Sequence, residues 1–194
     1  PLIQSGCQRT DESASNDPLA AYPWLYLRDN IPVKEDEEVV SLIAVGDIQL
    51  GRNVTNPSQA FKSVEQWLSG ADVTIGNLEC ALAMADEDSD PSQEQTPHSP
   101  IRLFADPQAA QWLSQAGFDV LSQANNHALD AGSQGLARTL QILESTGIKT
   151  IGALSPQQSQ AEPLIIEING IRLAFLGVNA IPSPPAGELS TMAD

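Results

Sequence analysis

The chain has 194 residues, which is long enough to bury one sizeable hydrophobic core. Apolar residues make up 41% and charged residues 18%, a composition typical of a globular rather than a disordered chain. The net charge of −16, from 9 Lys+Arg against 25 Asp+Glu, argues against nucleic acid or an anionic lipid surface as a partner, because both require clustered positive charge.

The first residues predict a leader rather than part of the core. Ser5 and Gly6 precede Cys7, and a stretch rich in Ser, Asp and Asn follows. This pattern resembles the cleavage end of a bacterial lipoprotein signal with Cys7 as the acylated residue, and the alternative is a disordered leader with an incidental cysteine. No apolar run is long enough to span a bilayer, so membrane contact is expected only through such an anchor. We therefore divide the chain into a leader, residues 1–37, and a domain, residues 38–194.

The first half of the domain predicts two strands separated by a helix. Residues 38–47 form a short, β-branched apolar run that ends at Gly-Asp, which favours a buried strand. Residues 56–70 predict an amphipathic helix with three apolar residues at helical spacing: Phe61, Val64 and Leu68. Residues 71–80 predict the next strand, and an acidic, Pro/Ser-rich insertion covers residues 85–100.

The middle of the domain predicts a short strand, a helix and a third long strand. Residues 101–107 favour the short strand, after which Asp106 is expected to cap a helix with Pro107 in its first turn and Leu113 facing inward. Residues 117–127 predict a strand that runs into the polar sequence ANNH.

The last part predicts a helix, a strand and a hairpin. Residues 133–147 favour an amphipathic helix that ends at Gly147, with an inner face made of three leucines: Leu136, Leu140 and Leu143. Residues 148–153 predict a fourth strand. Residues 162–178 contain two β-rich runs joined by Asn169-Gly170, which is the favoured dipeptide of a tight hairpin turn. The Pro-rich residues 179–194 carry no pattern, so we expect the domain to be incomplete at that end.

Strands and helices alternate along the domain, which predicts an α/β fold with a largely parallel core sheet and a late β-hairpin. Polar side chains follow three of the expected strands. In open α/β sheets ligands bind beyond the carboxyl ends of the strands, so we expect these side chains to meet at one edge. They are Asp47 after the first strand, Asn77 and Glu79 after the second, and Asn125, Asn126 and His127 after the third.

These residues suit a divalent cation or proton transfer. Carboxylate and amide oxygens suit Mg²⁺ or Mn²⁺, and an imidazole such as His127 can also donate a proton or stabilise a charged oxygen. Each residue has a structural alternative: Asp47 can satisfy backbone N–H groups at a strand end, and Glu79 can be merely exposed. Arg52 can hold phosphate or carboxylate, or be a surface cation.

The turn at residues 124–132 has its own alternative, a set of Asx turns leading into a helix with Asp130 or Ser133 as its cap. The other histidine, His98, lies in a Pro-flanked loop and is given no role.

Four blocks of the sequence carry a resemblance to a known family. They are VGDIQLGR, ADVTIGNLECAL, FDVLSQANNHALDAGSQGLARTLQILESTGIKTIGA and IRLAFLGV, in that order, within residues 39–178. The segment resembles the bacterial poly-γ-glutamate capsule biosynthesis protein CapA family. That family is similar to the calcineurin-like metallophosphoesterases, which implies layered β-sheets flanked by helices.

The resemblance also implies a site. Asp47 and Asn126 would be metal ligands, with Glu79 as the nearby carboxylate and His127 as the catalytic residue, and the cation would be Mn²⁺ or Mg²⁺. Two positions depart from the phosphoesterase pattern, because Gln49 replaces a histidine and Asn77 replaces an aspartate. Asp47 and Glu79 alone would supply two negative charges against the roughly four positive charges of a two-cation site.

The resemblance implies a role in capsule or poly-γ-glutamate biosynthesis, with metal-dependent hydrolysis of a phosphoester or amide-like bond at this site. The alternative is a non-catalytic surface scaffold that assists synthesis, tethering or export of an anionic polymer. In either case the expected location is extracytoplasmic, in the bacterial cell envelope and anchored through Cys7. The expected partners are the polymer synthase or the export machinery.

Overall fold

The computed structural model describes residues 38–84, 102–153 and 162–180. The predicted leader with Cys7, the acidic insertion with His98 and the end of the Pro-rich tail lie outside these described residues.

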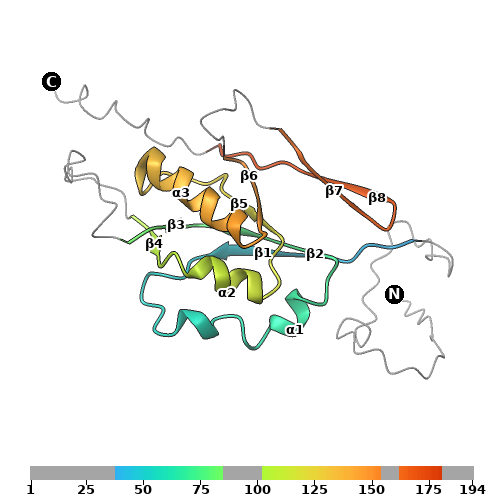
Figure 1. Ribbon diagram of the computed structural model, residues 1–194, viewed down its shortest axis with the longest axis horizontal. Coiled ribbons are helices and arrows are strands. Elements are labelled where there is room, and N and C mark those ends of the chain that lie inside the picture. Colours follow the sequence, from blue (N-terminus) through green and yellow to red (C-terminus); the bar gives the residue numbers. More distant parts are fainter. Residues whose placement is uncertain (1–37, 85–101, 154–161, 181–194) are drawn as a thin grey trace, which may run out of the picture.

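The core is a four-stranded parallel sheet, as the alternation of strands and helices predicted (Figure 1). Its strands lie in the order β1, β2, β5, β6, so each crossover returns the chain in the same direction. Their bounds are β1 (Leu42–Ile48), β2 (Val73–Leu78), β5 (Val120–Ser122) and β6 (Lys149–Ile151). All four carboxyl ends therefore lie at one edge, where the predicted site was expected.

Two helices, α2 (Ala109–Gln115) and α3 (Gly132–Ser145), pack on one face of the sheet. Leu113 of α2 and Leu143 of α3 are fully buried against the sheet residues Leu78 and Leu121. The predicted cap at Asp106 is wrong, because α2 begins at Ala109 with Gln108 as its N-cap and has no side-chain cap bond. The Asp106 carboxylate instead accepts a hydrogen bond from the Gln108 N–H at 2.7 Å, which forms the turn just before the helix.

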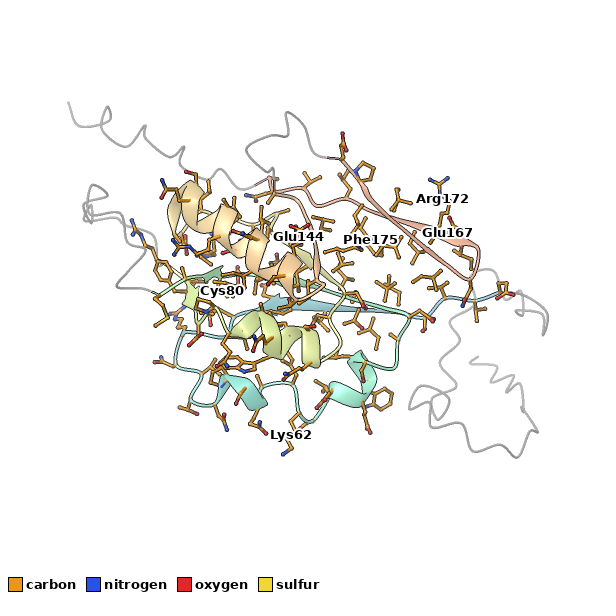
Figure 2. The ribbon with its side chains drawn as sticks, viewed as in Figure 1. Lys62, Cys80, Glu144, Glu167, Arg172 and Phe175 are labelled. Carbon is orange, nitrogen blue, oxygen red and sulfur yellow. The ribbon has the colours of Figure 1, made fainter. Side chains whose placement is uncertain are left out.

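The β-hairpin covers the opposite face. It consists of β7 (Leu164–Ile168) and β8 (Ile171–Phe175), joined by Asn169 and Gly170, whose φ angles of 51° and 74° confirm the predicted turn. Its inner side chains, Phe175 among them, form a second apolar cluster with Val73, Val120 and Ile151 of the sheet, while Glu167 and Arg172 face solvent (Figure 2). The core sheet thus lies between a helical layer and a β layer.

The helix predicted for residues 56–70 is broken. The segment forms a 3₁₀ turn, Pro57–Gln59, then a series of i→i+3 backbone bonds, and only one α-helical turn, α1 (Glu65–Leu68). Val64, expected to face inward, is 44% exposed. Tertiary packing overrides the helical pattern here, because Phe61 turns its ring edge-to-face onto Phe118, with centroids 5.2 Å apart.

The inner face of α3 is shifted from the prediction. Leu143 is buried as expected, but Leu136 and Leu140 are only half-buried, and the buried positions one and two turns earlier are Thr139 and Gly135. The reason is the small parallel sheet of β3 (Ala81–Leu82) and β4 (Phe104–Ala105), which lies close to the helix. The Thr139 hydroxyl accepts a hydrogen bond from the Leu82 N–H at 3.1 Å, so a small polar residue occupies the centre of that face.

Candidate functional site

The strand-end edge places Asp47 beside Asn77. The register of β1 against β2 shifts between Ala44 and Asp47, so that two residues of β1 lie opposite Gly76 alone. This bulge keeps Asp47 on the same face of the sheet as Ala44 and level with Asn77, whereas regular pairing would turn it to the helical face. The β-bulge in β1 therefore determines the direction of the Asp47 carboxylate.

A chain of side-chain hydrogen bonds runs along this edge. Asn77 Nδ2 donates to Asp47 Oδ1 at 2.8 Å, and Asn125 Nδ2 donates to Asn77 Oδ1 at 3.0 Å. Asn125 is 8% exposed, and it also donates to the Leu78 carbonyl at 3.0 Å and accepts from the His127 N–H at 3.0 Å. Four predicted site residues are thus joined, and Asn125 forms the Asx turn that was the structural alternative.

His127 is held by a carboxylate. Its Nδ1 lies 2.8 Å from Asp130 Oδ2, and the same oxygen accepts the Leu103 N–H at 2.5 Å. The side chains are 15% and 9% exposed, respectively. Asp130 was expected to cap α3, and Ser133 was the alternative, but the helix begins after Ala131 without any side-chain cap. Asp130 instead fixes the imidazole ring and anchors the segment before β4.

Glu79 and Asn126 stand apart from the hydrogen-bonded chain. Both are half-buried, and the backbone N–H of Glu79 continues the strand pairing by donating to the Ile48 carbonyl at 2.9 Å. Neither side chain takes part in the hydrogen bonds found among the described residues. Their predicted role as metal ligands stays a prediction.

Gln49 and Arg52 belong to the turn after β1. The Gln49 Oε1 accepts the backbone N–H groups of Gly51 and Arg52, both at 3.0 Å, so Gln49 builds the turn. Its Nε2 is buried without a hydrogen-bond partner in the described part of the chain. The side chain of Arg52 is exposed, in keeping with the surface-cation alternative.

Asp47 and Gln49 border a pocket of about 290 Å³ whose other walls are apolar, including Phe61, Leu68 and Phe118. Glu79, Asn126 and His127 do not line this pocket.

Cys80 follows Glu79 in the sequence but is part of the hydrophobic core. It is fully buried among the apolar residues between the sheet and the helices, and this burial raises the pKa of its thiol to about 11 (Figure 2). A thiol in that state is a poor nucleophile at neutral pH.

The described residues do not fit a two-cation site. They contain no group of three or more His, Cys, Asp or Glu side chains placed to hold a metal ion. Moreover, Asn77, which stands where the phosphoesterase pattern has an aspartate, directs an N–H rather than an oxygen at Asp47. A donor in that position competes with a cation for the same carboxylate oxygen.

Residues 41–192 match the family model described as bacterial capsule synthesis protein PGA_cap. The chain belongs to this family. The PGA_cap match includes every described residue of the hydrogen-bonded edge, from Asp47 to Asp130, and so confirms the family that the four sequence blocks indicated.

Curated relatives agree with the PGA_cap assignment. The capsule biosynthesis protein CapA of Bacillus anthracis is 29% identical over 167 residues, which cover 82% of this chain and 40% of that protein. The PGA biosynthesis protein CapA of Bacillus subtilis (strain 168) is 28% identical over 167 residues, covering 82% of this chain and 42% of that protein. An uncharacterized protein, y4sH of Sinorhizobium fredii, is 29% identical over 155 residues, covering 76% of this chain and 33% of its own length. The chain therefore spans less than half the length of each of these relatives.

Sequence reasoning missed two features of this candidate site. The pairing of His127 with Asp130 was overlooked because Asp130 was assigned to the helix cap, although a three-residue spacing within one turn could have indicated it. The contact of Asp130 with the Leu103 N–H joins residues 27 positions apart, and no local pattern signals it.

Proposed function

We propose that this chain forms part of a capsule biosynthesis protein that acts at the cell envelope on poly-γ-glutamate, and that His127 is its catalytic residue in a hydrolytic step. The name of the Bacillus subtilis relative, a PGA biosynthesis protein, supports the polymer, and family membership supports the role in capsule synthesis.

One observation carries the proposed chemistry: the 2.8 Å contact between His127 Nδ1 and Asp130 Oδ2. A carboxylate acceptor at Nδ1 keeps that nitrogen protonated, so Nε2 is left as the ring nitrogen that can exchange a proton with a ligand. Among the described residues, Nε2 has no hydrogen-bond partner. A protonated ring in this orientation can give its Nε2 proton to a leaving group or stabilise developing negative charge.

In the proposed step, water attacks the carbonyl carbon of a γ-glutamyl amide and the bond to nitrogen breaks. The His127 Nε2 proton passes to the leaving nitrogen, and a proton from the attacking water restores the ring. Asp130 stays ionised and holds the imidazole throughout. No cation is needed to write this step, in keeping with the poor fit of the described residues to a two-cation site.

The scaffold alternative is less well supported. A role in tethering or export needs an accessible surface but not a histidine whose ring is fixed by a nearly buried carboxylate. The net charge of −16 also opposes tight contact with a long polyanion, whereas a site that handles one bond at the sheet edge needs little contact area.

Capsule formation in a host that depends on the full-length protein tests the proposal. His127→Ala should abolish capsule production while the protein accumulates to normal levels. The matched control is His98→Ala, because His98 is the only other histidine in the sequence. Normal capsule from His127→Ala would reject catalysis by His127 and favour the scaffold.

We also propose that the protein is held outside the cytoplasm by acylation of Cys7. No helix among the described residues is long and apolar enough to cross a membrane. Cys7→Ser should move the protein from the membrane fraction to the soluble fraction, and retention of the variant in the membrane fraction would reject the anchor.

A further inference from the structure

The amide of Asn125 has only one orientation compatible with its surroundings. Its Nδ2 faces the Leu78 backbone carbonyl, which can only accept, and its Oδ1 faces the His127 backbone N–H, which can only donate. Exchanging the nitrogen and oxygen would place two acceptors together on one side and two donors on the other. Two backbone groups therefore fix the direction of this side chain.

The orientation of the Asn125 amide in turn fixes the orientation of the Asn77 amide. Because Asn125 presents an N–H to Asn77, the facing atom of Asn77 must be its oxygen, and the Asn77 Nδ2 is then turned toward Asp47. The Asp47 carboxylate therefore accepts a hydrogen bond of 2.8 Å from Asn77 Nδ2. The backbone groups of Leu78 and His127 fix which atom of Asn77 faces Asp47. Asn77 cannot turn its oxygen toward Asp47 without breaking its bond to the nearly buried Asn125.

We propose that Asn77 takes the place of a cation at this edge: its backbone-anchored N–H satisfies Asp47, so that Asp47 serves as an oriented hydrogen-bond acceptor and not as a divalent metal ligand. A cation held between Asp47 and residue 77 would need an oxygen ligand from each of them, and Asn77 directs an N–H at Asp47 instead. The other oxygen of Asp47 has no hydrogen-bond partner among the described residues, and on this exposed side chain it can accept a hydrogen bond from a ligand.

If Asn77 takes the place of a cation, a single substitution of Asn77 should create a metal site. Asn77→Asp would set two carboxylates about 2.8 Å apart, with Asn125 still donating to one of them. Two anions at that distance repel each other unless a cation or a proton lies between them. Carboxylate oxygens are the preferred ligands of Mn²⁺ and Mg²⁺, and affinity rises with the number of charged ligands.

The experiment measures Mn²⁺ binding to the full-length protein by calorimetry, together with the melting temperature with and without Mn²⁺. Asp47→Asn should leave the Mn²⁺ binding of the wild type unchanged, because Asp47 is not a metal ligand in the wild type. Asn77→Asp should bind Mn²⁺ at least about tenfold more tightly than the wild type. Its melting temperature should fall by about 2–4 °C without the cation and recover when the cation is added.

Asn56→Asp is the matched control, because it adds the same charge at an exposed asparagine outside the amide chain and should leave Mn²⁺ binding unchanged.

If Asn77→Asp does not fold in the absence of metal, refolding with Mn²⁺ should rescue it, and failure of that rescue counts against the inference. Wild-type Mn²⁺ binding that Asp47→Asn removes would overturn the inference, and so would an Asn77→Asp variant that folds but binds Mn²⁺ no more tightly than the wild type. The inference goes beyond the proposed function, and because cation binding and capsule formation are separate measurements, either idea can fail alone.

Discussion

At the scale of single residues, the site depends on how polar side chains are oriented. Asp130 accepts two hydrogen bonds on one oxygen, from the His127 ring and from the Leu103 N–H, and it is 9% exposed. A nearly buried carboxylate with two donors is a rigid support for an imidazole. The consequence is a histidine with one defined tautomer in its neutral form, with hydrogen on Nδ1.

This tautomer can be measured directly. In the neutral ring, ¹⁵N NMR should show His127 protonated at Nδ1 and unprotonated at Nε2, and Asp130→Asn should shift the population toward the Nε2–H form. His98→Gln removes the only other histidine and makes the assignment unambiguous. A ring that already favours Nε2–H in the wild type would contradict the arrangement.

Residues at this scale were partly predictable from sequence. Asp47, Asn77, Asn125 and His127 were located correctly because strand ends in a parallel sheet meet at one edge, which is a rule of topology. The direction of each hydrogen bond was not predictable, because it depends on backbone groups of Leu78 and His127 that only the fold brings into contact. The same holds for Gln49, whose turn contacts became evident only with the backbone path after β1.

At the scale of elements, small polar contacts decide how the secondary structures pack. Thr139 lies at the centre of the buried face of α3, and its hydroxyl is the side-chain partner of the Leu82 N–H. Both residues are essentially inaccessible to solvent. The leucine pattern predicted the helix correctly but not the residues at the centre of its buried face. A pattern of apolar residues cannot reveal a buried threonine that accepts a hydrogen bond from a neighbouring strand.

Replacing Thr139 tests this packing. Thr139→Val keeps the shape of the side chain but leaves the Leu82 N–H buried without an acceptor, so we expect a loss of about 1–3 kcal/mol in the free energy of unfolding. Thr139→Ser retains the hydroxyl and should retain most of the bond. Chemical denaturation gives both values, and equal stability of the Val variant and the wild type would show that the bond contributes little.

A second polar contact ties the start of β1 to the start of β2. Asp72 accepts hydrogen bonds from the Ser41 N–H at 2.7 Å and the Ser41 hydroxyl at 2.6 Å. The Ser41 hydroxyl bond and then its backbone bond lower the pKa of Asp72 below its usual value of 3.8. The folded state therefore gains stability above that value and loses it as the pH falls through the lowered pKa.

Ser41→Ala should show this pH dependence. At pH 7 the variant should melt up to about 2 °C below the wild type, a small effect because the contact is exposed. Below about pH 3 the difference should shrink, since Asp72 becomes protonated in both proteins. A difference that grows on acidification would have the wrong sign and would assign the stabilisation to another group.

At the scale of the whole molecule, a layered α/β domain presents one chemically distinct edge. The parallel sheet, the helical layer and the hairpin were predictable from the alternation of strand and helix patterns and from the Asn169-Gly170 turn. The break in the helix predicted for residues 56–70 was not, because it arises from aromatic packing between segments distant in sequence. The chain spans less than half of its curated relatives, so the activity is best tested in the full-length protein.

Catalysis by His127 is tested by comparing hydrolysis with stability in one variant. Purified full-length protein is assayed on poly-γ-glutamate and on a generic phosphodiester, with and without Mn²⁺, and its melting temperature is measured in parallel. If His127 is catalytic, His127→Ala should lower the rate by about 10²–10⁴. The melting temperature should change by less than about 4 °C, since Asp130 keeps its bond to Leu103. An unchanged rate, or a loss of activity that only accompanies unfolding, would contradict a catalytic His127.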